Sequence, residues 1–373
     1  MSEWGYKPLS EACNYVNSKI LINLIGLDNY ISTENMVAEK GGITKATMLP
    51  DTNSVSAYSE NDILTSNIRP YYKKIWFAKK SGGCSNDILV LRANKTTNSK
   101  FLYYALSDNN FFNYATTSSK GTKMPRGSKE AIMKYLIPDL PKGIQQKIAD
   151  ILSTYDDLIE NNNHRIELLE QAAQQLYKEW FVRFRFPGYK TAHFTKGIPD
   201  GWEVVKLSKI SDFAYGKMPE SKHIVNAGYP IFSGYRLVGY YDQYMYDEEM
   251  VIVVARGVGG TGDVKLAPTK CYITNLSIIF LLHEKNLYKN YIHQMFNITS
   301  LRYLDTGCAQ SQITIDNLKK VKILLPSRSL IQKYNSIINP LREQLNNLHA
   351  KNQNLIKQRD LLLPRLMSGK LEV

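Results

Sequence analysis

The chain has 373 residues, of which 43% are hydrophobic and 22% charged, and its net charge is +13. This composition excludes a natively disordered chain, and the length allows two domains of ordinary size. The positive charge suggests an acidic partner without identifying it. We find neither a signal-peptide pattern nor an apolar run long enough to span a membrane, so we expect a cytoplasmic protein.

The four cysteines lie far apart and never form a CxxC pair, and the six histidines do not fall at metal-ligand spacing. We therefore expect reduced, unreactive thiols and no metal site.

The first segment, residues 1–143, carries a positive charge concentrated in two loop-like stretches. "IRPYYKKIWFAKK" precedes Gly82-Gly83, and "SSKGTKMPRG" follows later. Basic and aromatic residues beside flexible glycines can neutralise phosphates and enter a DNA groove. A solvated charged loop is the alternative for each of them. The DNA-binding candidates in this segment are Arg69, Tyr71, Lys73, Lys74, Lys79, Lys80, Lys120, Lys123 and Arg126.

Residues 144–189 follow with apolar residues spaced three or four apart, which predicts a long amphipathic helix. Ile151 and Leu158 belong to this stripe, and Asn162 interrupts it. The seam residues that we predict in this helix are Ile148, Tyr155, Asn162, Ile166, Leu169 and Leu176.

The second segment, residues 190–326, contains "VIVVARGVGGTGDVKLAP", in which Gly257–Gly262 spell GxGxxG. A dinucleotide site would need a strand, these glycines and then a helix facing the phosphates. Pro268 and a β-rich stretch follow instead, so we favour a hairpin or wide loop between strands.

The same segment offers further polar and basic residues for a DNA groove. Arginine can form paired hydrogen bonds to guanine and glutamine to adenine, although glutamines in a turn can also serve only the backbone. The DNA-binding candidates here are Arg236, Tyr240, Arg256, Gly259, Gly260, Gln310, Ser311 and Gln312.

Residues 327–373 carry a second stripe with an unbroken alternation of four and three residues, interrupted by Asn352. Its predicted seam residues are Ile338, Leu341, Leu345, Leu348, Asn352, Leu355 and Leu362. Each stripe runs for about five heptads, longer than one face of a small domain can cover, so we expect the two helices to pair. Packing of each helix on its own globular core is the alternative. Pro340 should kink this helix or mark its start.

The two halves of the chain resemble each other in order. Trp4-x4-Leu9-Ser10 returns as Trp202-x4-Leu207-Ser208, and "YLIP" before the first helix returns as "ILLP" before the second. This pattern predicts a tandem duplication. We expect a mixed α/β fold with two similar domains separated by a pair of long antiparallel coiled-coil helices, because a duplicated chain closes most simply that way.

Catalytic motifs are absent from the sequence: there is no Walker loop, HExxH, GxSxG, nuclease-type acidic pattern or Asn-Pro-Pro-Tyr. This favours a binding protein over an enzyme.

Several stretches resemble the specificity (S) subunit of type I restriction-modification enzymes. They are "GIQQKIADILSTYDDLIENNNHRIELLEQAAQQLYKEWFVRFRFPG", "LLLPRLMSGKLEV", the repeated "LP" before each helix and "DILTSNIRPYYKKIWFA". The resemblance implies two target-recognition domains, residues 1–143 and 190–326, and two spacer helices, residues 144–189 and 327–373. Each domain would read one half of a bipartite, asymmetric sequence in double-stranded DNA, and the helices would set the unread gap.

The resemblance also implies a non-catalytic chain that needs no cofactor of its own. Two methyltransferase subunits would dock on it, and motor-nuclease subunits on those; the partners would use S-adenosylmethionine and ATP. "RGVGGTG" has no counterpart in the first half, so residue roles cannot be carried between the halves. Two alternatives stay open: a nucleotide- or S-adenosylmethionine-binding enzyme that uses Gly257–Gly262, and a coiled-coil scaffold whose basic lobes never reach DNA.

Overall fold

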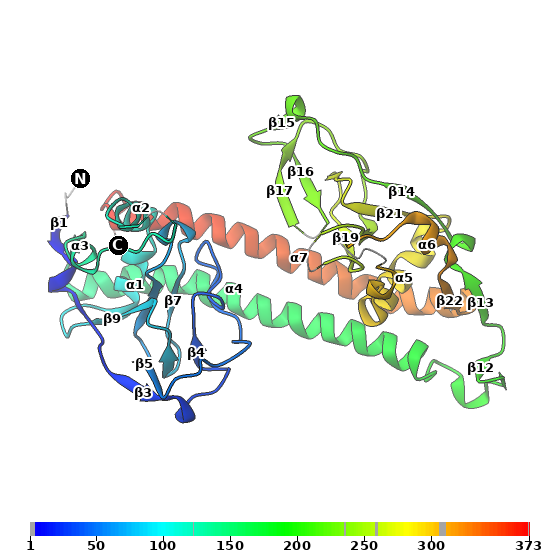
Figure 1. The fold of residues 1–373 in the computed structure, drawn as a ribbon, viewed down its shortest axis with the longest axis horizontal. Coiled ribbons are helices and arrows are strands. Elements are labelled where there is room, and N and C mark those ends of the chain that lie inside the picture. Colours follow the sequence, from blue (N-terminus) through cyan, green and yellow to red (C-terminus); the bar gives the residue numbers. More distant parts are fainter. Residues whose placement is uncertain (1–3, 122, 235, 258–259, 306–310, 372) are drawn as a thin grey trace. The chain divides into compact units, whose positions relative to one another are not determined.

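The structure, a computed structural model, describes residues 4–121, 123–234, 236–257, 260–305, 311–371 and 373. The chain forms two compact units: unit 1 combines Met1–Asn163 with Ala350–Val373, and unit 2 is His164–His349. Two long helices, α4 (Lys142–Tyr177) and α7 (Arg328–Met367), each contribute to both units (Figure 1).

The centre of unit 1 is a four-stranded antiparallel sheet with strand order β2-β9-β6-β7. Its strands are β2 (Cys13–Tyr15), β6 (Ile63–Ser66), β7 (Ile75–Phe77) and β9 (Ile88–Ala93). Successive residues point to opposite faces, so Ile63 packs in a core with helix α1 (Ser99–Ser107), while Leu64 packs in a second core toward another sheet. The central strands are therefore apolar on both faces.

The remaining elements of unit 1 cover this sheet. The second sheet has the order β3-β5-β8-β4 and comprises β3 (Lys19–Leu21), β4 (Tyr30–Ile31), β5 (Ser54–Tyr58) and β8 (Gly82–Cys84). Helices α2 (Asn109–Thr117) and α3 (Lys129–Met133) follow α1, and β1 (Gly5–Pro8) pairs with β10 (Leu136–Asp139).

Unit 2 repeats the central sheet with the order β14-β21-β18-β19. Its strands are β14 (Ser211–Tyr215), β18 (Met250–Val254), β19 (Val264–Ala267) and β21 (Ser277–Leu282), and helix α5 (Lys285–Thr299) follows. Val251 and Val253 pack in the larger core with α5, whereas Ile252 packs in the smaller core on the other face.

A strand pair and a second sheet of unit 2 also have counterparts in unit 1. A pair of strands, β13 (Glu203–Lys206) and β22 (Lys322–Leu325), matches β1 and β10. The second sheet, β15-β17-β16-β20, comprises β15 (Ile224–Val225), β16 (Tyr229–Ser233), β17 (Arg236–Tyr241) and β20 (Tyr272–Ile273). Helix α6 (Ile315–Lys320) and the short strands β11 (Phe194–Thr195) and β12 (Ile198–Pro199) complete the unit.

The expected mixed α/β fold with a duplicated module is therefore confirmed. The second sheets differ in strand order. When the four strands of each sheet are numbered along the chain, the order is 1-3-4-2 in unit 1 and 1-3-2-4 in unit 2, because β5 pairs with β8 but β17 pairs with β16. The duplication is thus strictest in the central sheet, where both faces are buried and the strand register is fixed by packing.

In unit 1, α4 and α7 pair antiparallel through partly buried polar contacts. Asn162 Nδ2 donates to Asn352 Oδ1 at 2.8 Å, and Asn352 Nδ2 donates to Asn163 Oδ1 at 2.8 Å. Nearer the start of α4, Asp156 accepts from Arg359 Nη1 at 2.5 Å and from the Tyr104 hydroxyl at 2.6 Å. The two asparagines that interrupt the predicted stripes therefore meet each other.

The helices also complete the core of each unit. In unit 1, Ile148 and Leu152 of α4 pack in one core with Leu363 and Leu366 of α7. In unit 2, the aromatic rings of Tyr177 and Tyr334 lie 6.3 Å apart. The helices thus pair with each other and also pack on the globular cores.

Several helix positions differ from the expected stripe. Ile151 and Leu158 are exposed, and Leu152 is buried in their place. α7 begins at Arg328 and continues through Pro340, so it does not start there. The other predicted seam residues are buried or half-buried: Ile148, Tyr155, Asn162, Ile166, Leu169, Leu176, Ile338, Leu341, Leu345, Leu348, Asn352, Leu355 and Leu362.

Three cysteines, Cys13, Cys84 and Cys271, are buried and free of disulfides, whereas Cys308 lies outside the described residues. Burial raises the pKa of the Cys13 and Cys84 thiols to about 12. Within the described ranges, every helix is too short or too polar to cross a membrane.

Replacing Asn352 by alanine should lower the free energy of unfolding by about 1–2 kcal/mol, because the half-buried amide of Asn162 loses its partner and the buried Asn352 side chain leaves a gap between the helices. The matched control is Asn354→Ala on the exposed face of α7, which should change stability by less than about 0.5 kcal/mol. Urea unfolding of both variants measures the difference. Equal midpoints for the two variants would show that the asparagine contacts do not stabilise the helix pair.

Candidate nucleic-acid interface

In unit 1 the loop between β6 and β7 is held in an uncommon backbone conformation. Arg69 and Lys73 flank a single 3-10 turn, Pro70–Tyr72, and have φ angles of 49° and 51°. Such angles are costly for residues other than glycine and persist where neighbouring structure imposes them. Here the Arg69 N–H donates to the Pro125 carbonyl at 2.8 Å, which ties this loop to residues 118–127.

The side chains of this loop divide into exposed and restrained groups. Tyr71 and Tyr72 are exposed, with ring centroids 4.8 Å apart. Lys73 forms an ion pair with Glu39 at 3.2 Å, and Lys74 donates to the Thr33 carbonyl; burial lowers the pKa of Lys74. The tyrosine rings are thus the part of the loop most available to a ligand.

The neighbouring stretch, residues 118–127, presents Arg126. Lys120 and Arg126 exchange backbone hydrogen bonds of 2.9 and 3.0 Å, which closes the stretch into a tight loop. Arg126 Nη2 donates to Asp87 Oδ1 at 2.9 Å, and Lys120 and Lys123 are exposed. The structure therefore brings Arg69, Tyr71, Lys120 and Arg126 to one edge of the central sheet.

Two predicted lysines of unit 1 lie elsewhere. Lys79 and Lys80 follow strand β7, at the end opposite to the loop, and Lys79 forms an ion pair with Glu160 of α4. They are exposed but do not belong to the same edge.

In unit 2 the glycine motif closes a β-hairpin. β18 and β19 pair antiparallel, with Val253 opposite Val264, and further strands follow in place of a helix. The expectation of a hairpin is confirmed, and the dinucleotide interpretation is wrong for this segment. Gly259 lies outside the described residues, and Gly260 is buried.

Gly262 explains why a glycine is required in this hairpin. Its φ is +91°, and a Cβ atom there would lie 2.5 Å from the Arg302 backbone nitrogen. The glycine thus allows close approach between two backbone segments.

The hairpin is tied to residues 311–313 by a backbone bridge like the one that holds the loop of unit 1. Arg256 and Gln312 form an antiparallel bridge, and Asp305 accepts hydrogen bonds from the Ser311 hydroxyl and from the Gln312 N–H, the latter at 2.8 Å. Arg256 is exposed, and Ser311 and Gln312 are half-buried, whereas Gln310 lies outside the described residues.

Two backbone hydrogen bonds of each edge have a counterpart in the other edge. In unit 1, Asn67 N donates to Asp87 O at 2.8 Å and Gly127 N donates to Asn67 O at 3.0 Å. In unit 2, Ala255 N donates to Leu276 O at 2.8 Å and Ile313 N donates to Ala255 O at 2.9 Å. The bridge between Ile68 and Arg126 likewise matches the bridge between Arg256 and Gln312.

These bonds supply the correspondence between the halves that the sequence lacks. We call the described parts of these two regions the paired-loop edges: residues 67–74 with 118–121 and 123–127 in unit 1, and residues 255–257 and 260–263 with 305 and 311–313 in unit 2.

Arg236 and Tyr240 lie apart from the hairpin of unit 2. Both are exposed on β17, which belongs to the second sheet. The predicted candidates of unit 2 thus occupy two different sheets.

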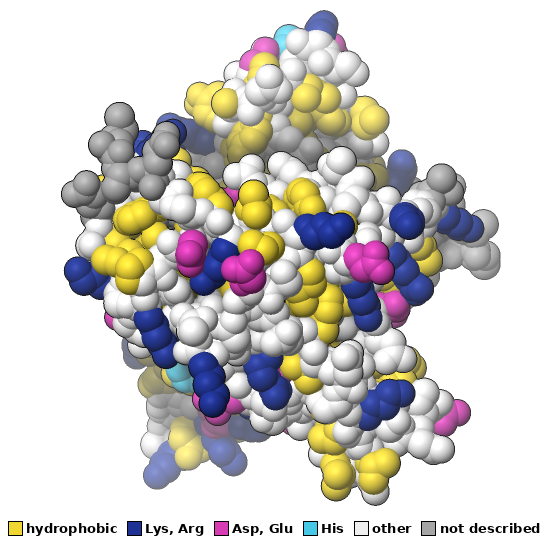
Figure 2. All heavy atoms as spheres, turned by 90° about the vertical axis from the view of Figure 1, so that its left-hand side faces the viewer, with side chains coloured by type: hydrophobic (Ala, Val, Ile, Leu, Met, Phe, Trp, Pro, Cys, Tyr) yellow, Lys and Arg dark blue, Asp and Glu magenta, His cyan; other side chains and the backbone are white. Residues whose placement is uncertain are grey.

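The basic side chains of one face of the molecule do not gather in one place (Figure 2). Figure 2 shows one face of the molecule, on which Lys and Arg side chains are scattered among hydrophobic and uncharged ones, with fewer Asp and Glu. On this face the basic side chains add charge that attracts a polyanion, but they do not form one continuous patch (Figure 2).

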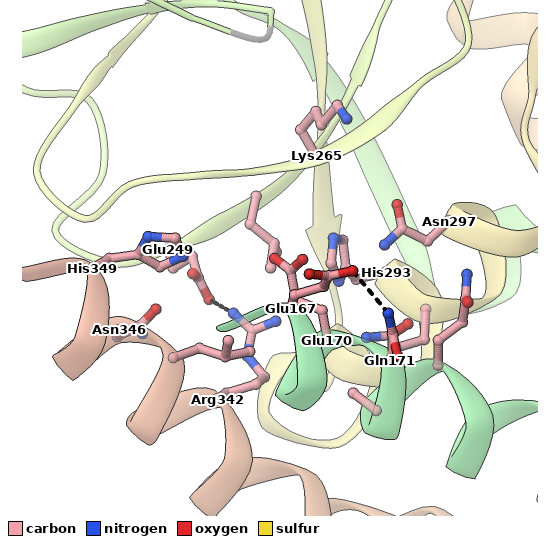
Figure 3. A pocket seen from close by; sticks show the side chains of 15 residues that line it. Glu167, Glu170, Gln171, Glu249, Lys265, His293, Asn297, Arg342, Asn346 and His349 are labelled. Carbon is pink, nitrogen blue, oxygen red and sulfur yellow. Dashed lines mark hydrogen bonds and ion pairs between the residues drawn. The ribbon is translucent and has the colours of Figure 1, made fainter. Parts of the chain in front are cut away.

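A cavity of about 500 Å³ in unit 2 is the other feature that could hold a ligand (Figure 3). It is lined by Glu167 and Glu170 of α4, Lys265 of β19, His293 of α5 and Arg342 of α7, among others, but not by the glycines of the hairpin. Arg342 forms an ion pair with Glu249. Burial, together with nearby Arg342, Lys265 and Lys289, lowers the pKa of His293 to about 3, so this imidazole is neutral. Among the described residues, no cluster of His, Cys, Asp and Glu suits a metal ion.

Sequence reasoning missed Asp87 and Leu276, whose carbonyls anchor the two paired-loop edges. Each comes just before a buried strand, but their position beside Arg126 and Gln312 depends on pairing between segments distant in sequence.

Gly262→Ala should destabilise unit 2 by at least about 2 kcal/mol, because the added Cβ overlaps the backbone of Arg302 and the φ angle is unfavourable. Gly257→Ala is the control from the same hairpin: its φ is +136°, but its Cβ has no neighbour within 4 Å, so only the conformational cost of about 1 kcal/mol applies. Thermal unfolding compares the two variants. A Gly262→Ala variant as stable as Gly257→Ala would contradict the close-approach role.

Comparisons with known proteins identify the family to which the chain belongs. A family model described as "Type I restriction modification DNA specificity domain" matches residues 1–171 and 199–358. The type I restriction enzyme MjaIX specificity subunit of Methanocaldococcus jannaschii is 30% identical over 303 residues, covering 74% of this chain and 69% of the relative. The HindI specificity subunit of Haemophilus influenzae is 22% identical over 466 residues and covers both chains fully.

The fold agrees. The S subunit of a type I restriction-modification system from M. genitalium superposes with a TM-score of 0.64 at 17% identity, covering 98% of this chain and 96% of that one. With two matched segments that together span most of its length, the chain belongs to the type I restriction-modification specificity-subunit family.

Proposed function

We propose that the chain is the DNA-recognition subunit of a type I restriction-modification complex, without catalytic activity of its own. Each of its two modules would read one half of a bipartite, asymmetric target in double-stranded DNA. The paired helices would set the number of unread base pairs between the halves.

The observation that carries this proposal is the repetition of the paired-loop edge. Both units hold two loops together by matching backbone bonds, and both present arginine or amide side chains there. Rigidly held side chains with paired hydrogen-bonding groups are what reading base edges in the major groove requires.

The domain limits in this proposal are residues 1–143 and 190–326 for the recognition domains, and 144–189 and 327–373 for the spacer helices. The DNA-facing set in unit 1 is Arg69, Tyr71, Lys120, Lys123 and Arg126, with Lys73 and Lys74 beside it. In unit 2 it is Arg256, Ser311 and Gln312; Gly260 is buried and is left out of this set, and Gly259 and Gln310, which lie outside the described residues, remain candidates. We assign Lys79, Lys80, Arg236 and Tyr240 to a peripheral role in attracting phosphates.

Its partners would be two methyltransferase subunits and, through them, motor-nuclease subunits. Adenine methylation and cleavage would be carried out by these partners with S-adenosylmethionine and ATP. Because its substrate is chromosomal or incoming DNA, we place the complex in the cytoplasm.

The decisive experiment is methylome sequencing of cells that carry the chain together with its methyltransferase subunits. We expect methylated adenines only within one bipartite motif with a fixed gap, and no such methylation when this chain is omitted. Methylation that is continuous in sequence, or that persists without the chain, would refute the proposal.

The helices permit a test of the spacing. Removing one heptad from α4 and the facing heptad from α7 keeps the antiparallel contacts in register and shortens the pair by about 10 Å, or about three base pairs of DNA. We expect the methylated motif to retain both half-sites with a shorter gap, or recognition to be lost. A functional variant with an unaltered gap would contradict a spacing role.

A further inference from the structure

The paired-loop edges contain three equivalent positions whose side chains differ between the units. Residues 68, 87 and 126 of unit 1 correspond to residues 256, 276 and 312 of unit 2, because the same bridges and hydrogen bonds connect them. In unit 1 the three residues are Ile, Asp and Arg, and in unit 2 they are Arg, Leu and Gln.

In unit 1 the acidic and the basic residue occur together. Asp87 accepts from Arg126 Nη2 at 2.9 Å, while the Arg126 side chain stays 59% exposed. One N–H of the guanidinium is used by this contact, and the others remain available to a ligand. A guanidinium fixed in this way is oriented for paired bonds to the O6 and N7 atoms of guanine.

In unit 2 both members of the pair are replaced by neutral residues. Leu276 is 37% exposed where unit 1 has Asp87, and Gln312 takes the place of Arg126. The Gln312 N–H is held by Asp305 at 2.8 Å, so its backbone is fixed. A glutamine amide suits the N6 and N7 atoms of adenine, and an exposed leucine suits the methyl group of thymine.

Arg256 differs from Arg126 in its restraint. It is exposed, and no ion pair holds its guanidinium among the residues that the structure describes. An exposed arginine at the start of the hairpin adds positive charge, which contributes phosphate affinity and no base selection by itself.

We propose that residues 126 and 312 are equivalent base-reading positions, with Arg126 selecting guanine in one half-site and Gln312 selecting adenine in the other. Asp87 is the positioning residue for Arg126, and Arg256 binds a phosphate. This inference rests on the proposed function and adds the residues that set its specificity.

The test uses the full chain with its methyltransferase subunits, and the readout is the methylome motif together with competition binding to duplexes altered at one base pair. Arg126→Ala should lower the preference for guanine at one base pair by between about five- and 150-fold, and leave the other half-site unchanged. Asp87→Ala should relax the same base pair, and Asp87→Asn, which can still accept a hydrogen bond, should restore part of the preference. A purely structural role for Asp87 would instead weaken binding to all sequences alike.

Two further variants distinguish the selection of bases from the attraction of phosphates. Arg256→Ala should weaken binding to every duplex and reduce its salt dependence, with base preference unchanged. Arg328→Ala removes the same charge from an exposed ion pair at the start of α7 and is the control, for which no change in base preference is expected.

The Asp87–Arg126 pair of unit 1 can also be introduced at the equivalent positions of unit 2. Leu276→Asp combined with Gln312→Arg should exchange adenine for guanine in the half-site of unit 2 alone. Unchanged methylation of the other half-site confirms that the variant has folded.

The experiment distinguishes failure of the proposed function from failure of the base-reading positions. If the wild-type chain yields no bipartite motif, the proposed function fails. If the wild type yields one and both the Arg126→Ala and the transfer variants keep it unchanged, only the reading positions are refuted.

Discussion

The pairing of α4 with α7 is the constraint on which unit 1 depends. Leu363 and Leu366 of α7 lie in the same core as Ile148 of α4 and the strands of the central sheet, so this core closes only when the helices are in one register. The contact between Asn162 and Asn352 selects that register, because a shifted helix would bury their amides without partners. Asp156, which accepts from Arg359 and Tyr104, ties the same register to the globular module.

The general architecture could be read from the sequence because it follows periodic patterns. The heptad stripes predicted both helices, and the glycines between β-rich runs predicted the hairpin of unit 2. Finer detail depended on tertiary contacts. Leu152 is buried instead of Ile151 because α4 packs on the module as well as on α7, which widens its buried face beyond a coiled-coil seam. Pro340 lies inside a continuous helix, since surrounding packing outweighs the local cost of proline.

The candidate interface was predictable by region but not by geometry. The basic run from Arg69 to Lys80 looks like one group in sequence, but strand β7 rises by about 3.3 Å per residue and so carries Lys79 away from the loop. Asp87 and Leu276 escaped notice because single residues before buried strands give no sequence signal. The matching backbone bonds show that Asp87 and Leu276 occupy equivalent positions in the two units, and the ion pair of Asp87 with Arg126 shows its contact in unit 1.

The chain order of unit 1 has a consequence for biosynthesis. Residues 363–367, which its core requires, leave the ribosome roughly 200 residues after the rest of that core, a delay on the order of tens of seconds at typical elongation rates. During that interval the nascent module must expose the apolar surface that α7 later covers. Slower translation or a stalled ribosome therefore prolongs a state that is prone to aggregation. Molecular chaperones can bind the exposed apolar surface until α7 packs on it.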